Sequence, residues 1–148
     1  MDVEARMTDE KPYSFGNHDR DGIRAGEYLH DMWLRLTVDL DMMVVDCEAA
    51  MDATPYTICP GVAPNIKRLI GLQIGKGFMR TAMQRLGGVE GCTHLRELLQ
   101  PVATVLFQTF VGLRGHSLER EVPPQLLNTC YSYDETGPVV TRRLPAEN

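Results

Sequence analysis

The amino-acid sequence predicts an α+β fold, with a small antiparallel sheet in the N-terminal half packed against about three helices in the C-terminal half. Residues 28–39 alternate between the two faces of an extended chain, as a strand with one buried face does. Residues 64–112 instead place apolar side chains three and four residues apart, which is typical of helices that bury one face. The 148 residues, 43% of them hydrophobic, suffice for a single domain over residues 1–148.

The N-terminal half contains three segments with strand character. Residues 3–7 alternate apolar and polar side chains, and residues 9–26 are rich in turn formers and predict a loop. Residues 28–39 form the clearest strand, and residues 43–49 continue as a second strand of a hairpin. The side chains expected on one face of the clearest strand are Tyr28, His30, Met32, Leu34, Leu36 and Val38.

The C-terminal half predicts helices that end at glycines. Pro64 is suited to the first turn of a helix that ends at Gly71, and residues 78–86 form a second helix before Gly87. A third helix is expected from about residue 91 to residue 112, with a kink at Pro101. The chain from residue 114 onward is expected to be irregular, with one last strand at residues 139–141.

Composition excludes several classes of protein. The 20 acidic against 15 basic side chains give a net charge of −5, which disfavours nucleic-acid binding. The sequence has neither a membrane-spanning apolar run nor a recognisable secretion signal, so we expect a cytoplasmic protein. No two of the four cysteines form a C-x-x-C pair, so we expect free thiols rather than a zinc ribbon or a disulfide framework.

Several short motifs resemble a known family. Residues 8–13 (TDEKPY), 29–37 (LHDMWLRLT), 55–59 (PYTIC), 69–72 (LIGL) and 91–99 (GCTHLRELL) follow the order and spacing of a bacterial domain-of-unknown-function family, number 2889. The resemblance covers nearly the whole chain and implies a bacterial protein, with a weak pointer to the catabolism of aromatic or acyl compounds. The family pattern has a further stretch upstream of residue 2, so the resemblance implies a short form.

The strongest candidate site lies at the start of the third predicted helix. Helical spacing places His94, Glu97, Thr104 and Gln108 on one stripe, and apolar neighbours suggest that Thr104 and Gln108 are buried. His94 could transfer protons with Glu97 orienting it, and a thiolate at Cys92 would be favoured by the helix N-terminus. The alternative is structural: Thr93 caps the helix, Cys92 is packed, and the two ionisable side chains face solvent.

A second candidate is His30 on the buried face of the strand. If the hairpin turn centres on Leu40, His30 lies opposite Ala50, close to the segment that carries Tyr56 and Cys59. An imidazole, a phenol and a thiol together would support acid–base chemistry or attack by a cysteine nucleophile. A core histidine bound to the backbone is the alternative for His30.

These candidates lead to two hypotheses. The first is an enzyme, a lyase, isomerase or hydrolase, that acts on a small aromatic or acyl catabolite without a cofactor or with a single divalent metal. Its catalytic residues would be His30, Cys59, Cys92, His94 and Glu97, and its substrate-binding residues Tyr56, Thr104 and Gln108; a metal would draw on His30, Cys92, His94 and Glu97. The second is a non-catalytic accessory protein that binds a metal or a small ligand. Both hypotheses expect a small-molecule ligand, neither nucleic acid nor membrane as a partner, and allow a homo-oligomer.

Overall fold

The computed structural model describes residues 1–113 and 122–143. The chain forms two compact units, Met1–Phe107 and Gln108–Asn148. The first unit contains the sheet and most of the helical residues, and the second contains short helices near the C-terminus. The expectation of a single domain over residues 1–148 stays a prediction.

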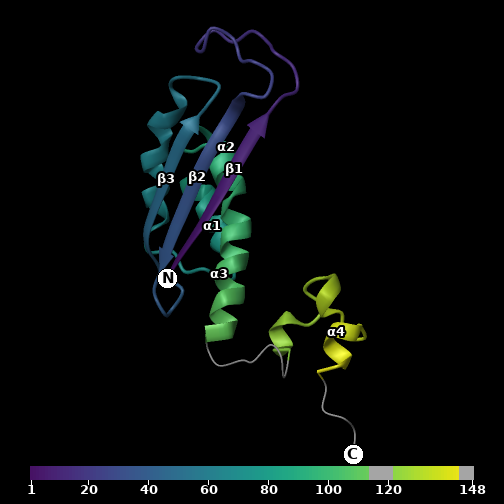
Figure 1. The fold of residues 1–148 in the computed structure, drawn as a ribbon. Coiled ribbons are helices and arrows are strands. Elements are labelled where there is room, and N and C mark those ends of the chain that lie inside the picture. The colour runs from purple at the N-terminus through teal and green to yellow at the C-terminus, as the bar shows by residue number, and fades with distance from the viewer. Residues whose placement is uncertain (114–121, 144–148) are drawn as a thin grey trace, which may run out of the picture. The chain divides into compact units, whose positions relative to one another are not determined.

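A three-stranded antiparallel sheet forms the first half of the chain (Figure 1). Its strands are β1 (Asp2–Glu10), β2 (Tyr28–Val38) and β3 (Val44–Ala53), and β2 lies between the other two. A tight turn joins β2 to β3, because the Asp39 carboxylate accepts hydrogen bonds from the backbone N–H groups of Asp41 and Met43. The predicted α+β class is confirmed.

The sheet has a buried and an exposed face. In β2 the predicted face is buried from His30 to Val38, whereas Tyr28 at its start is exposed. Apolar residues of β1 and β3 line the same face, since Val3 and Cys47 both pair with Leu36. The opposite face carries mainly polar side chains together with Trp33.

The first strand is longer than the sequence predicted, and the hairpin register differs. β1 continues to Glu10, so that Asp9 pairs directly with His30. The expected pairing of His30 with Ala50 was wrong, because Ala50 pairs with Trp33 instead. The turn is centred on Asp41 rather than on Leu40, because Val38 pairs with Val44, and two irregularities in the ladder shift the register further, which alternation of side chains alone does not reveal.

The helices follow the sheet in sequence (Figure 1). They are the 3-10 helix η1 (Cys59–Leu69), α1 (Phe78–Arg85), the short η2 (Gly88–Glu90), α2 (Thr93–Glu97) and α3 (Leu99–Leu113). Their apolar side chains and the buried face of the sheet form the core, in which Leu36, Leu69 and Leu99 are fully enclosed. The predicted start at Pro64 was wrong, since η1 begins at Cys59.

The third predicted helix is interrupted near its beginning. α2 ends at Glu97 and α3 begins at Leu99, so the expected single helix with a kink at Pro101 is two helices. Pro101 has no N–H to donate to the carbonyl of Glu97, but it is tolerated in the first turn of a new helix. The break therefore falls ahead of the proline.

The second unit has its own small core. It includes the 3-10 helices η3 (Pro124–Leu126) and η4 (Tyr131–Tyr133) and the helix α4 (Pro138–Thr141). Val111, Val122, Leu126 and Val140 pack together. The expected strand at residues 139–141 was wrong, because Pro138 begins a helical turn after Gly137. Across the described residues we find no helix with the length and apolar character needed to traverse a membrane.

Candidate functional site

Two histidines from distant parts of the sequence lie in contact. His30, near the start of β2, and His94, in α2, have ring centroids 4.0 Å apart with their planes inclined by 41°. His30 is buried with 6% of its surface exposed, and His94 is half-buried. The fold thus joins the two imidazoles that the sequence placed in separate candidate sites.

An aspartate holds the buried histidine in place. The carboxylate of Asp9 lies 3.1 Å from Nδ1 of His30 and forms an ion pair with Lys11. Hydrogen bonds from Lys11 and then from His30 keep the pKa of Asp9 below its usual value, so this carboxylate is ionised at neutral pH. A carboxylate at Nδ1 favours the proton on that nitrogen and leaves Nε2 of His30 as the acceptor.

A cysteine accompanies the second histidine. Sγ of Cys92 lies 3.9 Å from Nδ1 of His94, and Cys92 is the residue that immediately precedes α2. The capping role considered for Thr93 was wrong: its hydroxyl accepts a hydrogen bond from Arg96 at 3.2 Å. We refer to Asp9, His30, Cys92 and His94 as the histidine cluster.

The second histidine is biased toward its neutral form. Partial burial lowers the pKa of His94, and the adjacent His30 lowers it further, against weaker opposing effects of the Asp9 and Glu97 carboxylates. His94 is therefore mostly unprotonated at neutral pH and can accept a proton.

This pKa shift predicts a pH dependence of stability. Because the folded-state pKa of His94 lies below its ordinary value of 6.5, the unfolded chain takes up a proton first as the pH falls. The stability contribution is complete above that value and is lost as the pH falls toward the folded-state pKa. We expect the melting temperature of wild type to decline between about pH 7 and pH 5 more steeply than that of His94→Gln. Parallel curves for the two proteins would contradict the shift.

A buried carboxylate lies next to His30 in β2. Asp31 is 7% exposed and accepts two hydrogen bonds from Arg6, at 2.8 and 2.7 Å. These hydrogen bonds lower the pKa of Asp31, so the pair remains ionised. The Arg6 guanidinium also lies 4.7 Å from the centre of the Trp33 ring. This network ties β1 to β2 beside His30 and thereby helps to fix the cluster.

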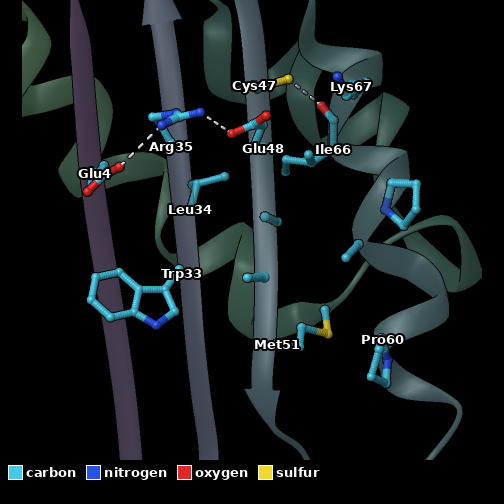
Figure 2. A pocket seen from close by; sticks show the side chains of 14 residues that line it. Glu4, Trp33, Leu34, Arg35, Cys47, Glu48, Met51, Pro60, Ile66 and Lys67 are labelled. Carbon is cyan, nitrogen blue, oxygen red and sulfur yellow. Dashed lines mark hydrogen bonds and ion pairs between the residues drawn. The ribbon is translucent and has the colours of Figure 1, made fainter.

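The larger described pocket lies elsewhere in the first unit. It has a volume of about 720 Å³ and is lined by β2, β3 and η1, with Glu4 of β1 at one end (Figure 2). None of its lining residues belongs to the histidine cluster. The chemistry-bearing side chains and this apolar hollow are therefore distinct features.

Comparison with known proteins identifies the family. Residues 1–108 match the family model DUF2889, which is described as a protein of unknown function. The chain belongs to this family. The curated proteins and the solved structures yield no match. All four residues of the histidine cluster fall within the DUF2889 match.

Other residues singled out from the sequence lie apart from the cluster. In the DUF2889 region Glu97 is exposed and acts on His94 only through its charge. The expected burial of Thr104 and Gln108 was wrong, since both are exposed, and the break before α3 interrupts the predicted stripe. The Thr104 hydroxyl donates a hydrogen bond to the Gln100 carbonyl.

The expected convergence of Tyr56 and Cys59 on His30 is also absent from the described contacts. Tyr56 is 57% exposed, and its carbonyl accepts hydrogen bonds from the Cys59 N–H and the Thr54 hydroxyl. No described hydrogen bond or ring contact joins either side chain to His30. Their role in a site stays a prediction.

The cysteines are all free thiols, as expected. Cys47 is the buried apolar residue that its strand pattern predicted: it is 1% exposed and its thiol donates to the Ile66 carbonyl at 3.0 Å. Burial raises the pKa of the Cys47 thiol to about 11, so it is unreactive. Cys92 is half-buried and Cys130 is exposed.

The described residues contain no group of three or more His, Cys, Asp or Glu side chains arranged to hold a metal ion. The set proposed from sequence, namely His30, Cys92, His94 and Glu97, is therefore not assembled as ligands in this geometry, because Glu97 is exposed and the two rings face one another.

Asp9 is the site residue that the sequence analysis missed. A strand ending at residue 7 would exclude it, whereas the same alternation continued to residue 9 places Asp9 on the face of Val3, Ala5 and Met7. A predicted strand that ends at residue 9 instead of residue 7 therefore includes Asp9, which pairs with His30 in the structure.

Proposed function

We propose that this chain is a small enzyme that performs acid–base chemistry at the histidine cluster. The observation that carries the proposal is the contact between His30 and His94, flanked by the Asp9 carboxylate and the Cys92 thiol. Two imidazoles, a carboxylate and a thiol within reach of one another supply both a proton donor and a proton acceptor. Such groups, drawn from three separate segments, are costly to bury for packing alone.

His94 acts as the base. Its lowered pKa leaves a lone pair available at neutral pH, and Sγ of Cys92 lies beside its Nδ1. As Sγ of Cys92 attacks a substrate, Nδ1 of His94 accepts the thiol proton, which is general-base activation of a nucleophilic cysteine. Alternatively, the neutral imidazole removes a proton from a bound substrate.

His30 can receive the proton that His94 has accepted, and Asp9 stabilises the resulting positive charge. Because like charges in contact repel, the two imidazoles resist carrying two protons at once. The ionised Asp9 stabilises the charge when it resides on His30. The pair can thus pass one proton between a donor and an acceptor position within a turnover.

The reaction class is a lyase, isomerase or hydrolase acting in the cytoplasm on a small aromatic or acyl compound, as the sequence analysis proposed. Proton transfer is the step that these reactions share, and the cluster needs no organic cofactor for it. A single divalent metal remains part of the proposal, and elemental analysis of the purified protein before and after chelation tests it.

Alkylation of Cys92 tests the proposal without knowledge of the substrate. We expect iodoacetamide to modify Cys92 faster than Cys130 near neutral pH, even though Cys130 is the more exposed thiol. Replacing His94 by asparagine removes the base, and the rate at Cys92 should fall about tenfold or more. Site-resolved mass spectrometry measures both thiols in the same sample.

Cys130 is the internal control, because its rate should be equal in wild type and His94→Asn. An unchanged rate at Cys92 in a folded His94→Asn protein would show that the thiol is not activated by the histidine. The accessory-protein alternative would then be preferred.

A further inference from the structure

A hollow lies where β3 meets η1, and none of the residues of the proposed enzyme site line it. Five consecutive residues of β3, from Cys47 to Met51, line it on one side. Pro60, Ala63, Pro64 and Lys67 of η1 line it on the other (Figure 2). Its volume of about 720 Å³ falls within the range of roughly 300–1,000 Å³ that is usual for small-molecule sites.

The lining of the hollow is mainly apolar and includes three small side chains. Ala49, Ala50 and Ala63 leave space that longer side chains would fill. Trp33 pairs with Ala50 across β2 and β3, and 36% of its surface is accessible beside the Arg6 guanidinium that lies over its ring. An apolar body would therefore displace water from Ala, Pro and Trp surfaces on binding.

The charged end of the hollow has an excess of carboxylate. Arg35 is shared by two acids: it forms an ion pair with Glu48 and lies 3.7 Å from Glu4 (Figure 2). Lys67 is already 3.5 Å from a further carboxylate, Asp46. Since the pair of Lys67 and Asp46 is neutral as a whole, one guanidinium against the two carboxylates of Glu4 and Glu48 leaves one negative charge, and this end favours a cation over an anion.

We propose that this pocket binds an apolar molecule with a single cationic group, of the arylalkylamine class. Its aromatic body lies over Ala50 against Trp33, and its ammonium lies toward Glu4 and Glu48. The inference is independent of the histidine cluster, which shares no residue with the pocket.

Trp33 provides the measurement, because it is the one tryptophan in the sequence. The probes are biphenyl-4-methylamine and biphenyl-4-carboxylate, which share a body and differ in the sign of the charge. We expect the amine to change the Trp33 emission saturably and to bind about tenfold more tightly than the carboxylate, as calorimetry would confirm. Absence of saturable binding by the amine, or equal or tighter binding of the carboxylate, would overturn the proposal.

Two pairs of variants locate the binding. Ala50→Phe fills the pocket from an exposed strand position and should abolish amine binding, whereas Val45→Phe adds the same bulk to β3 outside the pocket. Glu4→Gln should weaken amine binding several-fold, whereas Glu10→Gln, elsewhere on β1, should leave it unchanged. Binding that persists unaltered in folded Ala50→Phe and Glu4→Gln proteins would place the amine elsewhere and refute the assignment.

Discussion

Replacing Leu36 by alanine should lower the free energy of unfolding by about 2–5 kcal/mol. Leu36 lies at the centre of β2 with 0% of its surface exposed, between its cross-strand partners Val3 and Cys47. Removing its branched end leaves a cavity that a central strand, held by ladders on both sides, cannot collapse to fill. Chemical denaturation monitored by circular dichroism measures the loss.

Ile58→Ala is the matched control for this prediction. Ile58 is 82% exposed, so the same type of truncation removes few contacts and should change the free energy of unfolding by less than about 0.5 kcal/mol. Equal losses for the two variants would mean that the buried face of the sheet is not the core of the first unit.

Replacing Gly91 by alanine should disrupt both stability and the histidine cluster. A Cβ at this position would lie 2.2 Å from the Leu86 carbonyl oxygen and 3.1 Å from its Cβ, and Leu86 is buried at the end of α1. Backbone must therefore move, at a cost of about 1–3 kcal/mol. Since the next residue is Cys92, the movement should also separate His94 from His30 and slow alkylation of Cys92.

Gly75→Ala provides the comparison, because a Cβ there would meet no heavy atom within 4 Å. The alkylation rate at Cys92 in this variant should match that of wild type. Its melting temperature should match or slightly exceed that of wild type. A Gly91→Ala protein with wild-type melting temperature and wild-type Cys92 reactivity would show that the approach of residues 86 and 91 does not constrain the cluster.

The parts of the fold that could be predicted follow from patterns among neighbouring residues. The period of two in residues 28–38 identified β2 and nearly all of its buried face, and the apolar spacing of residues 78–86 identified α1. Boundaries were less well determined. β1 extends past residue 7 because pairing with β2 holds Asp9 and Glu10 in a strand, which their own propensity does not favour.

The sequence predicts parts of the candidate site. Residue type and position single out His30, Cys92 and His94, and the structure brings the two histidines together. A place for Tyr56 and Cys59 near His30 depends on a hairpin register that differs from the observed one. A place for Thr104 and Gln108 on the stripe of His94 depends on a continuous helix, which the break before Pro101 interrupts.

The sequence by itself therefore determined the three strands of the sheet and helix α1, because alternation and helical spacing are properties of neighbouring residues. Tertiary structure decided which elements meet. Asp9, His30 and His94 are separated by up to 85 positions (from 9 to 94), and only the pairing of β1 with β2 and the packing of α2 on the sheet bring them together. Contacts over such separations depend on the register of the strands, which a local pattern does not encode.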